Sequence, residues 1–335
     1  MKAALLGATT GIKNIALSNV QDPGKPARGE VRVRIFSNSL NFHDYNVASG
    51  VLPAVPGRIL MSDGAGVVED VGEGVTDFVT GDSVVSLFFP DWGDGEATQS
   101  GFSRTPGDGI DGYAATHVVR PASWFTRAPE GWSYAESSTL PTAGLTAWRS
   151  LFENGKIKAG DDVLILGTGG VSIFALQFAR MAGARVWATT SSDDKAEWLL
   201  QQGVAGVVNY RQEPEWGKKI LAMTDGRGVD HIVEVGGPGT LPQSITAARI
   251  GGNINLIGVF TGIAGDVPTA AIMGKQLVVR GVTVGSRAHQ ISMIRALNTT
   301  GLRPVIDKSF KLDQITAAFE YQASGHHIGK ICLKL

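Results

Sequence analysis

The chain has 335 residues, more than twice the roughly 150 of a typical domain, so we expect two domains with separate cores. Thirty Lys and Arg against 31 Asp and Glu give a formal net charge of −1, which argues against a nucleic-acid-binding protein and a polybasic membrane anchor. Cys332 is the only cysteine, which excludes an internal disulfide and a zinc-cysteine cluster and fits a reducing cytoplasm.

Glycine is the unusual component, with 44 of 335 residues, or about 13% against a usual 7%. The glycines follow no collagen-like period, so the extra ones indicate tight turns or close backbone approach. The N-terminal apolar run ends at Gly7, too short for a signal peptide, and is read as a first strand. The apolar stretch 163–179 is interrupted by glycines and carries Ser172 and Gln177, so we expect a soluble protein.

The first 120 residues predict mainly strands. Residues 31–35 alternate apolar and charged side chains, and short apolar runs at 66–68, 83–87 and 116–119 are bounded by turn-forming residues. Such short strands predict a barrel-like β domain. The segment 90–112 has neither a helical nor a strand period, and it is a lid, an interface arm or a disordered loop.

From about residue 140, apolar strands alternate with helical segments. Strands are predicted at 163–166, 185–189, 206–209, 230–235, 253–257 and 277–279, with helices at about 170–181 and 194–202. This alternation predicts a doubly wound parallel sheet. The tail predicts a helix around 312–319 and a closing strand at 329–333.

A glycine-rich turn lies between the first strand of this sheet and its helix. Gly167, Thr168, Gly169, Gly170 and Val171 stand where a backbone can approach a pyrophosphate at a helix N-terminus. A tight turn without a ligand is the alternative, and the surrounding strand-helix units favour dinucleotide binding. Ser172 replaces the third glycine of the usual pattern.

The end of the second strand bears on which dinucleotide is bound. A carboxylate there would bind the 2′-hydroxyl of NAD, whereas this chain has Thr190 and Ser191, with Lys195 nearby and Tyr210 after the next strand. We expect NADP (NADPH) to be preferred over NAD. The alternative is that Ser192 or Asp193 caps the helix and Lys195 is solvated.

Together these features resemble the medium-chain dehydrogenase/reductase superfamily. The resemblance is carried by 40–44 (LNFHD), 62–68 (SDGAGVV), 140–147 (LPTAGLTA), 233–237 (VEVGG) and 284–287 (VGSR). It is nearest to the zinc-free quinone oxidoreductase-like branch and the zinc-type alcohol dehydrogenase-like proteins. It implies an α/β fold: a GroES-like β-rich catalytic domain, 1–140 and 286–335, plus a Rossmann domain with a doubly wound parallel sheet, 141–285.

The resemblance also implies the positions of a catalytic metal. Zinc-dependent members hold the ion at positions matched here by Asn41, Ser62-Asp63 and Thr142. None of these is a thiolate or an imidazole, so we expect no zinc. The segment matching the lobe for a structural zinc, 90–112, contains no cysteine.

Without a metal, the substrate oxygen needs hydrogen-bond donors or a proton source, for which the candidates are Asn41, His43 and Asp44. His43 is either a proton donor near neutral pH or a structural residue, and Asp44 more readily orients its neighbours or the cofactor ribose. Family positions also imply cofactor contacts at Thr142, Thr146, Gly258, Val259, Phe260, Val284, Gly285 and Ser286.

The sequence therefore predicts a zinc-independent, NADPH-preferring oxidoreductase that transfers hydride to a quinone, an enone or another carbonyl-type substrate. An NAD(P)-dependent alcohol dehydrogenase or carbonyl reductase is the alternative within the class, and a non-catalytic dinucleotide-binding sensor or structural protein lies outside it. A small molecule is the expected partner, with no nucleic acid and no membrane. The family implies a homodimer or homotetramer.

Overall fold

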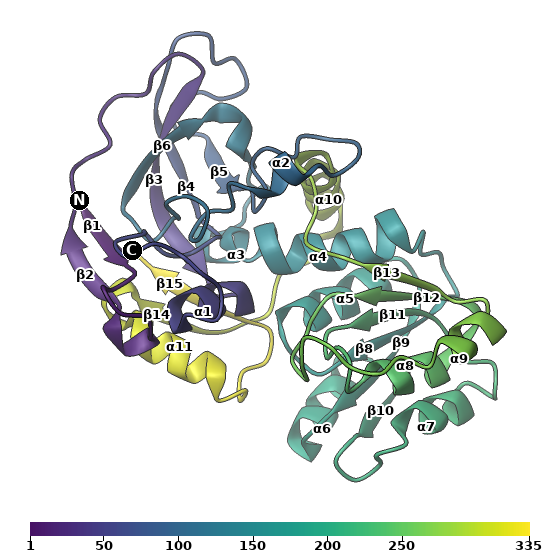
Figure 1. Ribbon diagram of the computed structural model, residues 1–335. Coiled ribbons are helices and arrows are strands. Elements are labelled where there is room, and N and C mark those ends of the chain that lie inside the picture. The colour runs from purple at the N-terminus through teal and green to yellow at the C-terminus, as the bar shows by residue number, and fades with distance from the viewer. The chain divides into compact units, whose positions relative to one another are not determined.

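The computed structural model describes all residues, 1–335, and the chain divides into two compact units. Unit 1 comprises 1–145 and 284–335, and unit 2 comprises 146–283 (Figure 1). A membrane-crossing helix is absent, since none of the helices combines the necessary length with an apolar sequence.

Unit 2 is built on a six-stranded parallel sheet with the strand order β10-β9-β8-β11-β12-β13. This order reverses beside β8, the first strand of the sheet in the chain, as in doubly wound nucleotide-binding folds. The parallel sheet predicted from the sequence is confirmed. Its strands are β8 (Asp162–Leu166), β9 (Arg185–Thr190), β10 (Gly206–Asn209), β11 (Val229–Glu234), β12 (Ala248–Leu256) and β13 (Val278–Gly281).

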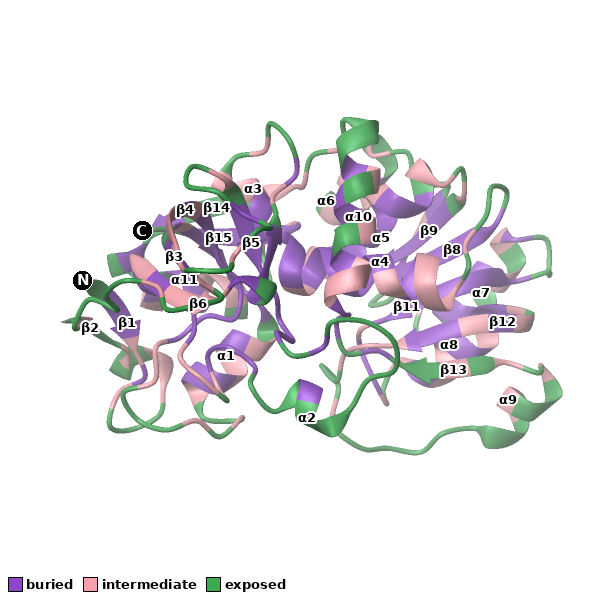
Figure 2. Cartoon of the chain, turned by 90° about the horizontal axis from the view of Figure 1, so that it is seen from above, coloured by how far each residue is buried: buried purple, intermediate pink, exposed green.

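The central strands of this sheet are buried because helices cover them. All five residues of β8 and all six of β11 are buried, whereas β13 and α9 are largely exposed (Figure 2). After Asp162, β8 is a continuous apolar run, as is typical of a strand buried on both faces, whereas β11 also buries Asp230, His231 and Glu234. The helices are α5 (Gly170–Met181), α6 (Asp193–Gln201), α7 (Trp216–Met223), α8 (Leu241–Ala247) and α9 (Thr269–Gly274).

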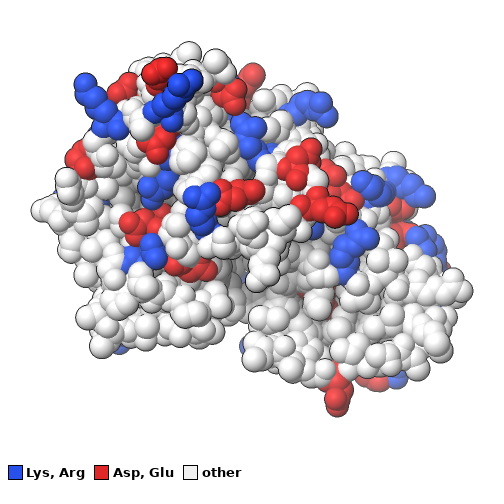
Figure 3. Space-filling model, turned by 45° about the horizontal axis from the view of Figure 1, so that its top comes forward, with Lys and Arg blue, Asp and Glu red and all other residues white.

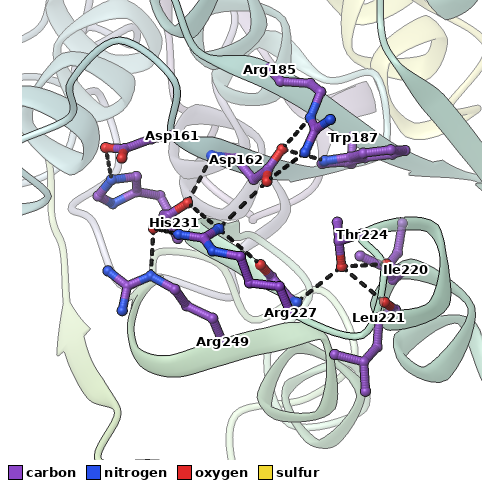
Figure 4. A network of polar contacts seen from close by, with 12 residues as sticks. Asp161, Asp162, Arg185, Trp187, Ile220, Leu221, Thr224, Arg227, His231 and Arg249 are labelled. Atoms are coloured by element: carbon purple, nitrogen blue, oxygen red, sulfur yellow. Dashed lines mark hydrogen bonds and ion pairs between the residues drawn. The ribbon is translucent and has the colours of Figure 1, made fainter.

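An ionic network joins the amino ends of four parallel strands, β8, β9, β11 and β12 (Figure 4). Asp162 in β8 accepts hydrogen bonds from Arg185 and from the Trp187 indole, and its backbone N–H donates to Asp230 of β11 at 2.9 Å. Asp230 also accepts from Arg227 at 2.8 Å and from Arg249. The network therefore fixes the strands at the edge opposite their carboxyl ends.

Unit 1 contains a seven-stranded, mostly antiparallel sheet with the order β14-β15-β3-β4-β5-β7, and β6 pairs with β3. A separate hairpin pairs β1 with β2. The β-rich first domain and the closing strand predicted from the sequence are both present. The strands are β1 (Lys2–Leu5), β2 (Ala16–Asn19), β3 (Glu30–Ser39), β4 (Ala65–Val71), β5 (Ser83–Ser86), β6 (His117–Pro121), β7 (Phe125–Arg127), β14 (Ile306–Lys311) and β15 (Lys330–Lys334).

The C-terminal tail completes the core of unit 1. Leu312, Ile315 and Phe319 pack with residues of the first helix, and β15 pairs antiparallel with β3. The helices of unit 1 are α1 (Phe42–Ser49), α2 (Gln99–Phe102), α3 (Tyr134–Ser138), α10 (Arg287–Thr300) and α11 (Ile315–Ala323). A further helical segment, 140–154, contains α4 (Leu145–Trp148) and carries the chain from unit 1 into unit 2.

The segment 90–112, which has no sequence period, packs through aromatic rings instead. Phe89 stacks on Phe102 with ring centroids 4.2 Å apart, and Trp92 is buried against Phe102. Arg104 pairs with Asp91 through two hydrogen bonds of 2.6 Å. The segment is therefore an ordered loop containing the short helix α2.

Charged side chains are mixed on the surface. On the face drawn in Figure 3, blue and red side chains are interspersed, and neither sign forms an extended patch of its own. This matches the near-balance of 30 basic and 31 acidic residues in the sequence.

Candidate functional site

The glycine-rich turn of unit 2 leaves β8 and opens α5. Gly167 has a φ of 71°, a left-handed conformation that favours glycine, and its N–H donates to Thr189. Gly169 is the N-cap of α5, and no side chain caps the helix. The first N–H groups of α5 therefore remain available for an anion, which is the donor set that a dinucleotide pyrophosphate requires.

Ser172, which replaces the third glycine, is accommodated inside the turn. Its side chain is buried, and its hydroxyl donates to the carbonyl oxygen of Leu166 at 2.7 Å. The hydroxyl bridges helix and strand at the position where a glycine permits close packing, so the substitution leaves the turn intact.

The residues predicted to distinguish NADP from NAD gather at the carboxyl edge of β9 and β10. Thr190 ends β9, and its carbonyl accepts from the N–H of Tyr210, whose side chain is exposed. Ser191 and Lys195 are half-buried. Ser192 caps α6 by accepting from the N–H of Lys195, as the alternative interpretation of that serine expects. No carboxylate ends β9, whereas a strict NAD site would have one.

The same edge is shaped by the buried carboxylate of Glu234, the last residue of β11. It accepts from the N–H groups of Gly236 and Gly237 at 2.8 and 3.1 Å and from the hydroxyls of Thr240 and Ser244. Glu234 thereby fixes the loop that follows β11.

Gly258 follows β12 beside that loop. A Cβ at Gly258 would lie 1.9 Å from the carbonyl oxygen of Val235, so the close approach of the two loops requires glycine. The next two side chains, Val259 and Phe260, are exposed. The carboxyl edge of the sheet therefore presents backbone and apolar surface together.

In unit 1, Asn41 and Asp44 position the start of α1. The carboxylate of Asp44 accepts from the N–H of Asn41 at 2.9 Å and from the N–H of Ser62 at 2.7 Å. Asp44 is buried and both of its oxygens are engaged, which suits the orienting role considered for it.

Asp63 lies at the centre of the unit 1 site. Its side chain is fully buried and accepts from the Thr142 hydroxyl at 2.6 Å, the Asn41 amide at 2.9 Å and the Ser39 hydroxyl at 3.1 Å. The ammonium of Lys330, itself buried, donates to the side-chain oxygen of Asn41 and to the carbonyl of Leu40, each at 2.5 Å. Burial raises the pKa of Asp63 to about 6, although Lys330 opposes the rise.

His43 lies on α1 between two carboxylates. Its Nε2 is 3.0 Å from Asp108 and its Nδ1 is 3.8 Å from Asp44. Burial alone would lower the pKa of His43, but the two carboxylates outweigh it and raise the pKa to about 9. The imidazole is thus a cation at neutral pH, and it holds its proton more firmly than an isolated histidine does.

The positions that match metal ligands do converge, but their chemistry does not fit zinc. They supply the Asn41 amide, the hydroxyls of Ser62 and Thr142, and the Asp63 carboxylate, which already has three donors. An ammonium lies within this set, and zinc favours thiolate and imidazole ligands. No group of three or more His, Cys, Asp or Glu side chains in the chain is arranged to hold a metal ion.

The remaining predicted cofactor residues lie at the two points of the sequence where the chain passes from one unit to the other, after 145 and after 283. Thr146 is buried in α4. Val284 is buried with a φ of 48°, a left-handed conformation that is strained for a β-branched residue. Gly285 faces Leu145, and the Ser286 hydroxyl caps α10 by accepting from the N–H of His289. Of these, Val284 carries the feature most often found at ligand sites.

Asp63, Lys330 and Asp108 make contacts that the sequence does not predict. Asp63 enters the sequence prediction only as a replaced metal ligand, although its place after Ser62 is a usable signal. Lys330 meets Asn41 across 289 residues of sequence, and Asp108 comes from a segment without any period. Nothing local in the sequence indicates either of these contacts.

Two family models match the chain. One described as the alcohol dehydrogenase GroES-like domain matches residues 27–130, and one described as zinc-binding dehydrogenase matches residues 170–299. These matches confirm the predicted combination of a GroES-like and a Rossmann-type domain.

Relatives and solved structures cover nearly the whole chain. A zinc-type alcohol dehydrogenase-like protein of Schizosaccharomyces pombe is 40% identical over 97% of this chain and 96% of its own. A crystal structure of a putative alcohol dehydrogenase from Sinorhizobium meliloti 1021 is 35% identical, with a TM-score of 0.91 over 100% of this chain and 99% of that one. A structure described as an NAD-dependent alcohol dehydrogenase is 30% identical, with a TM-score of 0.90 over 100% of both chains.

Proposed function

Because this chain belongs to the medium-chain dehydrogenase/reductase superfamily and is an NAD(P)-dependent oxidoreductase, we propose that it reduces a quinone, an enone or another carbonyl-type substrate with NADPH and without zinc. When bound, the reduced nicotinamide supplies the hydride. The residues of the chain bind the dinucleotide, orient the substrate and supply the proton.

The observation that carries the zinc-independent part is the donor set around Asp63. Asn41 and Thr142 direct their side chains to Asp63, and the Lys330 ammonium provides the buried positive charge. The charge that develops on a substrate oxygen is then stabilised by hydrogen bonding and proton transfer. The names of the matched model and of the fission-yeast relative mention zinc, and these residues argue against carrying that property over to this chain.

The NADPH preference is supported by the end of β9. Thr190, Ser191 and the half-buried Lys195 offer hydroxyls and a cation where a carboxylate would repel a 2′-phosphate. One similar structure is described as NAD-dependent, so the NAD(P)-dependent alcohol dehydrogenase or carbonyl reductase is the second candidate. It would use the same donor set on an alcohol/carbonyl couple.

The experiment is a substrate panel with the purified protein. NADPH or NADH is mixed with quinones, enones and ketones, and oxidation is followed at the nicotinamide absorbance band. Faster turnover with NADPH and an enone or quinone supports the proposal, and turnover confined to ketones with NADH supports the second candidate. NADPH binding without oxidation by any compound argues for a non-catalytic role.

Metal analysis tests the zinc-independent part separately. Protein purified without added zinc should contain far less than one zinc per chain, and a chelator should leave its turnover unchanged. One tightly bound zinc per chain, lost together with activity on chelation, contradicts the proposal.

We also propose that the chain forms a homo-oligomer and works in the cytoplasm. The strand β13 lies at the edge of the sheet and leaves Val278 exposed, and in the segment before it Ile263 and Met273 are 93% and 76% exposed. An edge strand and exposed apolar side chains suit pairing with a second copy, which supports a homodimer or homotetramer. Light scattering of the purified chain tests this. The lone Cys332 is buried, which suits the reducing cytoplasm.

A further inference from the structure

A chain of hydrogen bonds crosses the unit 1 site from a half-buried hydroxyl to a buried ammonium. Thr142 contacts one carboxylate oxygen of Asp63 at 2.6 Å, and Asn41 contacts the other at 2.9 Å. Asn41 in turn accepts from Lys330 at 2.5 Å. The contacts join β15, the start of α1, Asp63 two residues before β4 and the segment 140–144, so the network is a tertiary feature of the fold.

The residues of this hydrogen-bond network differ in how far a ligand can reach them. Asp63 is 0% exposed, Lys330 4% and Asn41 6%, whereas Thr142 is only half-buried. The donors of Asn41 already point to Asp63 and, more weakly, to Ser62. Thr142 is therefore the end of the network from which a proton can reach a bound molecule.

We infer that the Thr142 hydroxyl is the catalytic proton donor to the substrate and that buried Asp63 replaces the proton that Thr142 gives up. The inference rests on the proposed reductase function and names the residues that complete its chemistry. Lys330 and Asn41 are positioning residues, since they act on the substrate only through Asp63.

The proton and electron balance is closed for a carbonyl substrate. The carbonyl carbon accepts the hydride, and the C=O π pair becomes a lone pair on oxygen. The step starts from the protonated form of Asp63, in which the carboxyl donates to the Thr142 oxygen and frees the Thr142 proton for the substrate. The substrate oxygen takes the proton of the Thr142 hydroxyl while Thr142 takes the proton of the Asp63 carboxyl. The Asp63 carboxylate that remains faces the Lys330 ammonium, and water later returns one proton. For an enone the hydride adds to the β-carbon and the same proton goes to the enolate.

The charges around Asp63 suit this exchange. Burial raises the pKa of Asp63 to about 6; Asp44 also raises it, whereas Lys330 and the hydrogen bonds from Thr142 and Asn41 lower it. Tyr113 and Cys332 are the other titratable groups that interact with Asp63. An acid with a pKa near the working pH can both give and regain a proton.

His43 is the competing donor, and it is less suited. Its pKa is raised to about 9 by Asp108 and Asp44, so its proton is held more tightly at neutral pH than the proton of an isolated histidine. Nε2, the nitrogen nearer to a carboxylate, is engaged with Asp108 at 3.0 Å.

The test compares Thr142→Val, which removes the hydroxyl at nearly constant shape, with Thr142→Ser, which keeps it. The matched control is Thr139→Val, because the Thr139 hydroxyl is bonded only to the backbone oxygen of Glu136. With a substrate found in the panel, we expect Thr142→Val to lower kcat by about 10²-fold or more and to abolish the solvent deuterium isotope effect of a proton in flight. Thr142→Ser should retain most of kcat, and Thr139→Val should leave both kcat and NADPH affinity nearly unchanged.

Equal turnover in Thr142→Val and Thr139→Val overturns the inference while leaving the reductase function in place. Loss of turnover in His43→Gln with full turnover in Thr142→Val also overturns it, in favour of His43. A panel in which no compound oxidises NADPH overturns the proposed function, and this inference with it.

A second measurement follows the proton on Asp63 without a substrate. Infrared difference spectra of the wild-type protein should show a protonated carboxyl band that titrates near pH 6 and is missing in Asp63→Asn. In Lys330→Met the band should titrate at higher pH, because the ammonium that favours the carboxylate is gone. A carboxyl that stays ionised down to the ordinary aspartate range overturns the relay.

Discussion

The Nε2 atom of His43 lies 3.0 Å from a carboxylate oxygen of Asp108, which joins the first turn of α1 to the loop 90–112. The loop therefore supplies a charge to the site despite having no regular structure over most of its length. The ring of His43 also meets Phe88 edge-on at 5.1 Å, so the imidazole is held by an ion pair and an aromatic contact together.

Replacing Asp108 by Asn should bring the pKa of His43 down from about 9 toward its usual value of about 6.5. Because the folded pKa is above the unfolded one, the pair stabilises the fold fully below about pH 6.5, and this contribution is lost as the pH rises through 9. We expect Asp108→Asn to cost about 1–2 kcal/mol at pH 6 and little at pH 10. Ring-proton NMR and urea unfolding at both pH values measure this.

Asp94→Asn is the control, since Asp94 lies in the same loop and its carboxylate accepts only from the N–H of Gly95. A histidine pKa that stays near 9 in Asp108→Asn would show that Asp108 does not hold the proton.

Lys195→Ala should weaken NADPH binding by about 10- to 100-fold, the strength of one hydrogen bond to a charged group, and leave NADH binding almost unchanged. Lys218→Ala is the control, because Lys218 lies on α7 and pairs with Glu215. Isothermal titration calorimetry with NADPH and with NADH measures the two affinities in both variants. Equal losses for NADPH and NADH would remove Lys195 from the 2′-phosphate site.

Gly258→Ala places a Cβ 1.9 Å from the backbone oxygen of Val235, so the loops after β11 and β12 must move apart. We expect a loss of about 1–3 kcal/mol in the free energy of unfolding and weaker NADPH binding. In Gly281→Ala, the control, nothing lies within 4 Å of the new Cβ. Thermal unfolding with and without NADPH tests both variants, and identical behaviour of the two would refute the close approach.

Asp230→Asn breaks the ionic network at the amino edge of the parallel sheet. Burial opposes ionisation of Asp230, but hydrogen bonds from Arg227, the Asp162 N–H and Arg249 hold its pKa well below the usual range. With the folded pKa below the unfolded one, this stability is present above about pH 4 and is lost as the pH falls through the folded pKa.

We expect Asp230→Asn to destabilise the fold by about 2–4 kcal/mol at pH 7, with a smaller difference below pH 4. Guanidinium unfolding from pH 7 to below pH 4 measures this loss of stability. Asp266→Asn is the control, because Asp266 is exposed. NADPH affinity of the folded variant should be unchanged, since the network lies at the other end of the strands. A pH-independent difference would mean that the carboxylate charge is not what stabilises this edge.

The sequence predicts the parallel sheet well because each of its strands is a local apolar run between turn signals. The glycine turn at 167–170 is equally local. By contrast, β14 carries charged residues on an exposed strand and has no strong pattern, and it was not predicted.

The candidate site was predicted only in part, for a related reason. Asn41 and Asp44 stand together in a short stretch, so the sequence points to both. The contact of Lys330 with Asn41 and that of Asp108 with His43 arise only once β15 pairs with β3 and the loop 90–112 packs on its aromatic rings. A contact between residues that lie far apart in the sequence leaves no periodic pattern from which it could be predicted.

The buried ammonium of Lys330 also limits how this chain could be converted into a metalloenzyme. Placing thiolates at 41 and 142 and an imidazole at 62 would supply ligands that zinc prefers, yet the Lys330 amine would remain beside them and would repel the ion whenever it is protonated. A redesign of this chain would need to remove Lys330 in the same step, and Asp63 would then lose a neighbouring positive charge that favours its ionised form. The polar network and a zinc site therefore make opposite demands on position 330.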